Sequence, residues 1–339
     1  MTTKPIEHSE QLKKCSEILK AMVAEMAEVS PDTFPDKKTI HTEMPVQLAI
    51  IAEQAERLAE LKPKDKIFGL EYHESDHQTL MTLFMDDLVQ FTTQHNIDLG
   101  FNILSYGQRR IPEHAFYHLA VSPLLPATYK SIEQHGGRVF EIYSIPFKIR
   151  AALELKLSSI VGFDHYDAMR DGKTLRVSTE VPVARLLNAL QSIDCLDLPC
   201  SLVNIKNIYQ WACDFCHTGE KEYLWLTMKA LEIVSPLFIW EEQKKAEIVI
   251  SDRWPSEGMS EQEKLTRFIN YQGPHRPLYY FREGWSVQKL QDTLNEMEES
   301  KRIAALEKNR NIESWVYHLS ETKLAEANDY YCDRTKNHY

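Results

Sequence analysis

The segment His73-Glu74-Ser75-Asp76-His77 comes closest to a catalytic motif by residue type and spacing. Its form, H-E-x-x-H, allows two histidines on one helix face to hold zinc while the glutamate acts as a base. Two features count against a zinc protease. Ser75 opens an S-x-x-Q capping box, which predicts a helix that begins there and leaves His73 outside it. Leu83 also stands where a metzincin would carry its third histidine.

The same residues support a second hypothesis that needs no zinc. Residues 67–72 are predicted to form a strand, and ligands of open α/β sheets bind where strands end and helices begin. His73, Glu74, Asp76 and His77 would then lie at such an edge and could be the catalytic acid–base groups of a hydrolase, with or without metal. The alternative is an ordinary polar helix N-terminus, where acidic side chains favour the helix dipole.

Four of the six cysteines lie close together in the sequence, as Cys195-x4-Cys200 and Cys213-x2-Cys216. Paired thiolates at such spacings are typical of structural zinc sites in reducing compartments. The alternative is a set of buried free thiols, because cysteine packs as a small hydrophobic residue. We expect no cofactor, with zinc on these four cysteines as the alternative.

An aromatic segment near the C-terminal third combines guanidinium and aromatic side chains: Tyr279, Tyr280, Phe281, Arg282 and Trp285. These residue types dominate the centres of protein interfaces, and they can also stack on unpaired bases. The chain carries a net charge of -11, which disfavours general affinity for a phosphate backbone. We therefore expect protein partners or a homo-oligomer here, with nucleic acid as a disfavoured alternative.

Composition indicates a folded protein without a membrane segment. Of the 339 residues, 43% are hydrophobic and 10% are aromatic, which is typical of globular proteins. No apolar run is long enough to span a bilayer, and the N-terminal residues show no signal-peptide core. With only six cysteines, a disulfide framework is not indicated. We expect a cytoplasmic protein.

Apolar residues recur with helical or strand periods over much of the chain. The predicted helices cover 9–29, 45–61, 127–135, 146–160, 183–193, 201–217, 223–238 and 260–271, with one more beginning at Ser75 and a helical stretch over 286–331. The predicted strands cover 67–72, 97–105, 138–145, 173–179 and 246–251. Strands that alternate with helices predict a helix-dominated α/β or α+β fold with a mixed or parallel central sheet in the middle of the chain. A helical protein with a small sheet is the alternative.

This pattern predicts three regions: a helical N-terminal extension and linker over 1–42, an α/β-like domain over 43–194, and a mainly helical C-terminal domain over 195–339. Patterns of the P-loop, G-x-S-x-G and G-x-G-x-x-G types are absent from the sequence. The leading expectation is a soluble intracellular assembly or regulatory subunit that acts through protein–protein contacts. The alternatives are the hydrolase described above and a nucleic-acid-associated protein with the cysteine zinc site.

Overall fold

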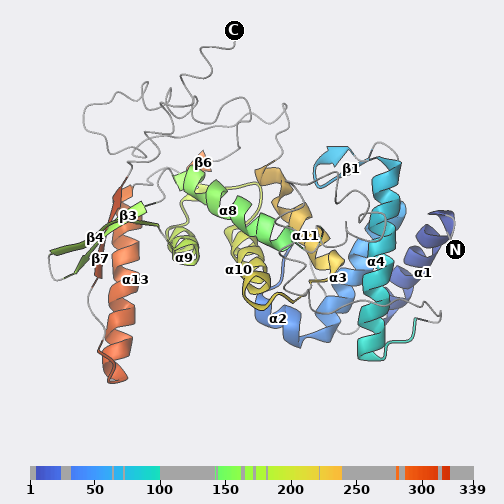
Figure 1. The fold of residues 1–339 in the computed structure, drawn as a ribbon, viewed down its shortest axis with the longest axis horizontal. Coiled ribbons are helices and arrows are strands. Elements are labelled where there is room, and N and C mark those ends of the chain that lie inside the picture. The colour runs from blue at the N-terminus through green and yellow to red at the C-terminus, as the bar shows by residue number, and fades with distance from the viewer. Residues whose placement is uncertain are drawn as a thin grey trace, which may run out of the picture. The chain divides into compact units, whose positions relative to one another are not determined.

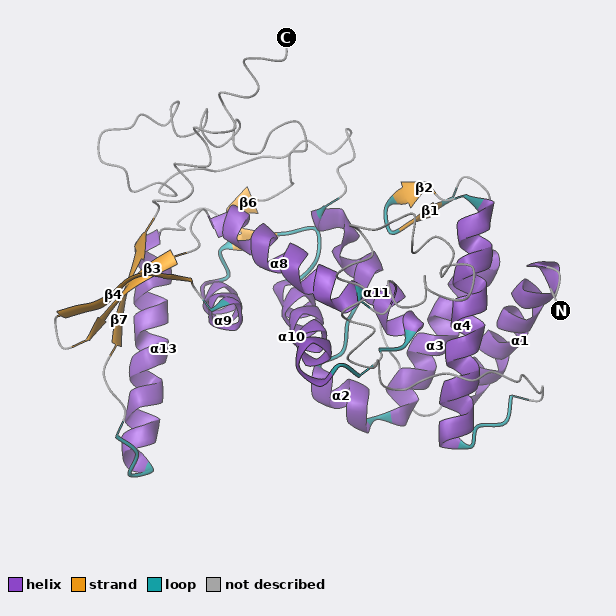
Figure 2. Ribbon diagram, in the orientation of Figure 1, coloured by secondary structure: helices purple, strands orange, loops and turns teal. Residues whose placement is uncertain are grey.

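A computed structural model shows the fold, in which helices predominate among the described residues (Figures 1 and 2). The residues it describes are 5–23, 32–62, 65–71, 73–99, 142, 144–161, 165–170, 173–180, 182–220, 222–238, 280–281, 287–311 and 315–320. None of the described helices is both long and apolar enough to cross a membrane.

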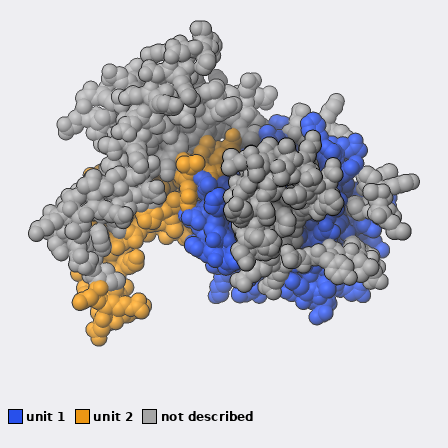
Figure 3. All heavy atoms as spheres, in the orientation of Figure 1, with its two compact units in different colours: residues 1–151, 207–235 blue, residues 152–206, 236–339 orange. Residues whose placement is uncertain are grey.

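The chain divides into two compact units, each made from separate stretches of sequence (Figure 3). Unit 1 consists of Met1–Ala151 and Asn207–Ser235, and unit 2 consists of Ala152–Lys206 and Pro236–Tyr339. Two helices, α8 (Ile145–Val161) and α10 (Leu202–Thr218), contribute residues to both units. The three regions expected from the sequence are a different division and stay a prediction.

Unit 1 is built around α3 (Met44–Glu60), which packs against four other helices. These are α1 (Pro5–Val23), α2 (Lys37–Thr42), α4 (Glu74–His95) and α11 (Leu224–Val234). The largest fully buried side chains in their core are aromatic: Phe34, Phe84, Phe91, Trp211 and Trp225. Burial of such rings is among the strongest contributions to stability that a helical unit can make.

Polar side chains also cross between α3 and α11 inside unit 1. The ammonium of Lys229 is fully buried and lies 2.5 Å from a carboxylate oxygen of Glu53. Gln54 donates to Glu232 at 3.1 Å, and Arg57 forms an ion pair with the same Glu232. A buried charge is tolerated only with such partners, so these pairs fix how the two helices face each other.

The residues before α4 form a hairpin instead of the predicted strand over 67–72. Strands β1 (Lys66–Ile67) and β2 (Leu70–Glu71) pair antiparallel, and Phe68 and Gly69 between them both have positive φ. Two positive φ values in a two-residue loop are typical of a tight hairpin turn. The prediction of one continuous strand was therefore wrong, because the turn reverses the chain in its middle.

Unit 2 contains a three-stranded antiparallel sheet, in which β3 (His165–Arg170) lies between β4 (Lys173–Glu180) and β7 (Trp315–Ser320). Helix α13 (Val287–Glu307) packs against β7 and against α9 (Val183–Ile193). Arg185 of α9 and Glu298 of α13 form an ion pair at 3.0 Å beside the buried leucines of both helices. A second pair of strands, β5 (Leu196–Asp197) and β6 (Tyr280–Phe281), is also antiparallel. A single 3-10 turn, η1 (Ser235–Leu237), follows α11.

The prediction of a central sheet is wrong for the described part of the chain, whereas the predicted dominance of helices is confirmed. Each described strand belongs to one of three small separate sheets, and each strand pairing is antiparallel. Parallel neighbours in a sheet need crossover connections between them. The described strands are antiparallel neighbours instead, and they pair either across a tight turn or between segments far apart in the sequence. The continuous C-terminal helix over 286–331 is also wrong, because α13 ends at Glu307 and β7 follows.

Several predicted elements cannot be compared with the structure. Residues 97–99 are described and are not a strand. The rest of the predicted strand over 97–105 lies outside the described residues. Four other predicted segments also lie wholly or mostly outside the described residues: 127–135, 138–145, 246–251 and 260–271.

Candidate functional site

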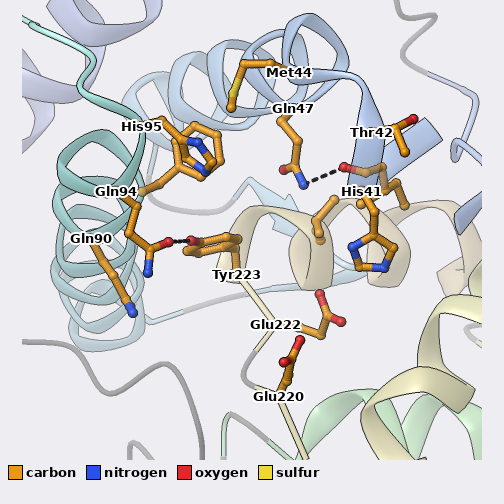
Figure 4. A pocket seen from close by; sticks show the side chains of 13 residues that line it. His41, Thr42, Met44, Gln47, Gln90, Gln94, His95, Glu220, Glu222 and Tyr223 are labelled. Atoms are coloured by element: carbon orange, nitrogen blue, oxygen red, sulfur yellow. Dashed lines mark hydrogen bonds between the residues drawn. The ribbon is translucent and has the colours of Figure 1, made fainter. Parts of the chain in front are cut away.

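Unit 1 contains a pocket of about 400 Å³, which we call the polar pocket (Figure 4). Three stretches line it: α2 with the start of α3, the C-terminal half of α4, and the connection from α10 into α11. Its lining residues are Ile40, His41, Thr42, Met44, Gln47, Gln90, Phe91, Gln94, His95, Glu220, Glu222, Tyr223 and Leu226. Most of these side chains can donate or accept hydrogen bonds.

The connection between α10 and α11 supplies the acidic side chains of the polar pocket. Gly219 ends α10 with a φ of 63°, a conformation that favours glycine, and its N–H donates to the carbonyl of Phe215 at 2.9 Å. The chain then passes through Glu220 and Glu222 before α11 begins. At that start the N–H of Leu224 donates to the buried carboxylate of Asp87 at 2.7 Å. Asp87 of α4 thereby fixes the position of the connection.

Hydrogen bonds also hold three other lining side chains of the polar pocket, Tyr223, Gln94 and Gln47. Tyr223 donates its hydroxyl proton to Oε1 of Gln94 at 2.8 Å, as Figure 4 shows. Gln47 donates from Nε2 to the carbonyl of Ile40 at 3.0 Å, and its Oε1 accepts from the indole N–H of Trp225 at 3.1 Å. Both ends of the Gln47 amide are therefore engaged, which fixes the orientation of this side chain.

An aromatic cluster packs against Tyr223 in the wall of the polar pocket. The Tyr223 ring stacks on Trp225, with centroids 4.5 Å apart and planes 9° from parallel. Phe91 meets the Tyr223 ring edge-on at 5.3 Å and lies 4.5 Å from the ring of His95. Since Phe91 and Trp225 are buried, the wall that Tyr223 presents rests on the core of unit 1.

Glu222 has the most perturbed carboxyl group among the described residues of the polar pocket. Its pKa is raised to about 7, chiefly by burial, while the Trp211 indole N–H acts in the opposite direction and the nearby carboxylates of Asp214 and Glu220 add to the rise. Burial dominates because it removes the water that stabilises the ionised form. At neutral pH this carboxyl group can therefore exist in both protonation states, as an acid–base or ligand-binding group requires.

Asp214 of α10 carries negative charge next to this site and has two partners on α2. It forms an ion pair with Lys37 of α2, and a second oxygen lies 3.8 Å from Nε2 of His41. Lys37 does not line the polar pocket. Lys37 therefore neutralises Asp214, whereas the carboxylates of Glu220 and Glu222 face the polar pocket.

The residues of the H-E-x-x-H motif lie at the start of α4. His73 is the N-cap residue, so the helix begins at Glu74, and Ser75 is inside it. The predicted capping box is therefore displaced: Asp76 accepts from the His73 N–H at 3.3 Å, whereas Gln78 was expected to play that part. His73, Glu74 and Asp76 are exposed, and His77 donates to the carbonyl of Leu58 at 2.7 Å.

The structure places the four candidate zinc ligands in different units. Cys195 and Cys200 belong to unit 2, and Cys213 and Cys216 belong to unit 1. Burial raises the pKa of Cys200 to about 12, and Cys216 donates to the carbonyl of Ala212 at 3.4 Å. No group of three metal-binding side chains occurs within the described ranges. The cysteine zinc site stays a prediction.

Only part of the predicted aromatic interface is described. Tyr280 and Phe281 form β6, where they pair with Asp197 and Leu196 of β5. Tyr279, Arg282 and Trp285 lie outside the described residues.

Sequence reasoning missed the polar pocket because its walls are far apart in the chain. Gln94 and Tyr223, which are joined by a hydrogen bond, are separated by 129 residues. The nearest local signals are Gln90 and Gln94, four residues apart on α4, and two glutamates just before a helix start. Each signal alone is typical of a solvated surface, so only the fold brings them together.

Comparison of the chain with protein-family models, with curated proteins and with solved structures gave no match.

Proposed function

We propose that this chain binds a small polar molecule and that the polar pocket of unit 1 is its binding site. The observation that carries the proposal is a pocket of about 400 Å³ in which carboxylate, imidazole and amide side chains converge. Natural sites for small molecules have volumes of this order and combine an apolar wall with a few placed polar groups.

Two further features support a binding role over a chance gap in packing. The hydrogen bonds of Gln47 and Gln94 hold the wall in one arrangement before any ligand arrives, which lowers the entropy lost on binding. Glu222 is kept partly buried with a pKa near 7, and such perturbed groups concentrate at functional sites.

Blocking the polar pocket tests the proposal. Thr42 lines it and is exposed, so Thr42→Trp should fill the space without opening a cavity. Thr79→Trp is the matched control, since Thr79 is also exposed and also donates its hydroxyl proton to the carbonyl four residues earlier. Ligand-observed NMR with a fragment library should find binders to the wild type and Thr79→Trp that Thr42→Trp no longer binds. If no fragment shows this difference, the proposal is wrong.

A second candidate is the assembly or regulatory subunit expected from the sequence, acting on another protein. One observation favours it: α13 exposes Ile303 and Leu306, one helical turn apart, at 47% and 45%. Exposed apolar neighbours on a helix are typical of contact surfaces for other proteins. Scattering-coupled gel filtration and pull-downs should then show a complex that Ile303→Glu weakens. A monomer without partners would exclude this role.

We also propose a reducing compartment such as a cytoplasm. Cys15, Cys200 and Cys216 are free thiols, which supports that location. Fractionation of cells that express the full protein tests it, and recovery of disulfide-linked protein would contradict it.

A further inference from the structure

We propose that the ligand of the polar pocket is an organic cation, a protonated amine carried on an apolar or aromatic body. This inference rests on the proposed function and names the class of molecule that the site recognises. It is carried by the charges that line the pocket and by their position opposite an aromatic wall.

The lining charges favour a cation over an anion. Glu220 and Glu222 face the polar pocket, and none of the described residues that line it is a lysine or an arginine. Lys37 pairs with Asp214, a carboxylate outside the lining. Among the described lining residues an anion would therefore meet two carboxylates and no lysine or arginine, whereas an ammonium group would gain charge-assisted hydrogen bonds.

The arrangement of the side chains also suits a molecule with two different ends. In Figure 4, Glu220 and Glu222 lie together at the bottom of the view, Tyr223 lies above them, and Met44 and His95 lie in the upper part. Phe91 and Leu226 add apolar surface to the same lining. An ammonium group at the glutamates would place its apolar body against the wall of Tyr223, where burial of carbon surface adds affinity.

A cationic ligand should bind the ionised form of Glu222, so its affinity should depend on pH. Among the residues that the structure describes, the charged or titratable groups around Glu222 are Glu220 and Asp214, with Asp87 on the α4 side and His41 on the α2 side. Glu222 has a pKa of about 7, so it is mostly protonated one pH unit below and mostly ionised one unit above. An amine with a pKa near 10 stays charged throughout, and it should bind about tenfold more weakly at pH 6 than at pH 8.

Three matched probes separate the charge from the shape: 2-phenylethylamine, which is a cation at these pH values, neutral 2-phenylethanol, and anionic phenylacetate. Titrations of the full chain by ligand-observed NMR should rank the amine first at pH 8. Glu222→Gln should weaken its binding about tenfold and abolish the dependence between pH 6 and pH 8. Loss of the pH dependence in Glu222→Gln assigns that dependence to the Glu222 carboxyl group.

Glu60→Gln, at an exposed carboxylate of unit 1 outside the polar pocket, is the control and should bind the amine as the wild type does. If Glu222→Gln folds poorly, Glu220→Gln provides a second test, because it should also weaken binding of the amine. If phenylacetate or 2-phenylethanol binds as tightly as the amine and Thr42→Trp abolishes that binding, the cation inference is wrong and the binding site stands. If none of the three probes binds in a way that Thr42→Trp abolishes, while other fragments do, the cation inference is again wrong. If no molecule at all binds in that way, the proposed function fails with it.

Discussion

Replacing Glu222 by glutamine should make unit 1 more stable, and the gain should grow with pH. Burial raises the pKa of this carboxyl group from 4.5 to about 7, so the folded chain holds its proton more tightly than the unfolded chain. The sign follows directly: stability is highest when Glu222 is protonated in both states, and it falls as pH rises from about 4.5 to about 7. Above that range the full penalty of ionising a buried carboxyl group is present.

The size of the effect follows from the same two values. Each pH unit between them corresponds to about 1.4 kcal/mol, which gives an upper bound of about 3.5 kcal/mol above pH 7. Solvent reaches part of the Glu222 side chain, so we expect a gain of about 2 kcal/mol in Glu222→Gln at pH 8 and well under 1 kcal/mol at pH 5.

Urea unfolding followed by circular dichroism, at several pH values, measures this difference between variant and wild type. Glu220→Gln is the control, because that side chain is exposed and should shift stability only slightly. A gain of the same size at pH 5 and pH 8 would refute the reasoning, since it would show that Glu222 does not titrate near neutrality in the folded chain. A loss of stability at pH 8 would refute it as well.

Three other changes test the packing of unit 1 and its thiols. Glu53→Gln should destabilise the chain by about 2 kcal/mol in urea unfolding, because it removes the carboxylate 2.5 Å from the buried ammonium of Lys229. The double variant Glu53→Leu/Lys229→Met should recover most of that loss, and no recovery would contradict the ion-pair account. Asp87→Ala should cost about 1–3 kcal/mol, because a buried N–H at the start of α11 loses its acceptor, and Asp87→Asn should cost less; equal losses would argue against the hydrogen bond. Cys15 is buried and its pKa is raised to about 12, so iodoacetamide should label it in the native protein far more slowly than Cys216, as mass spectrometry can measure, and equal labelling would contradict its burial.

Helices with a clear apolar period were predictable from the sequence. The segment 183–193 coincides with α9, and 45–61 differs from α3 by one residue at each end. Local side-chain periodicity decides these segments, because each helix buries one face and exposes the other. The long helix over 286–331 failed where Asn309 takes a positive φ of 55°, and a polar residue there does not by itself reveal that a strand follows.

The sheets were less predictable because their partners are distant in sequence. β3 and β7 pair in register from His165 with Ser320 to Arg170 with Trp315, and no local pattern identifies that partner. The polar pocket is a similar case, since its wall joins Gln94 to Tyr223 across the fold. The H-E-x-x-H motif shows the reverse: its spacing is conspicuous, and the structure makes it the capped start of a helix.

The decisive measurement is a protein-observed NMR titration of the full chain with the fragments that bind it. The indole N–H of Trp225 donates to Gln47 in the wall of the polar pocket, so its signal reports on that wall. Trp225→Phe assigns the signal. If the polar pocket is the binding site, this signal shifts and saturates with the same affinity as the ligand signals, and the shift disappears in Thr42→Trp. Fragments that bind while the Trp225 signal stays unchanged would contradict a binding role for the polar pocket.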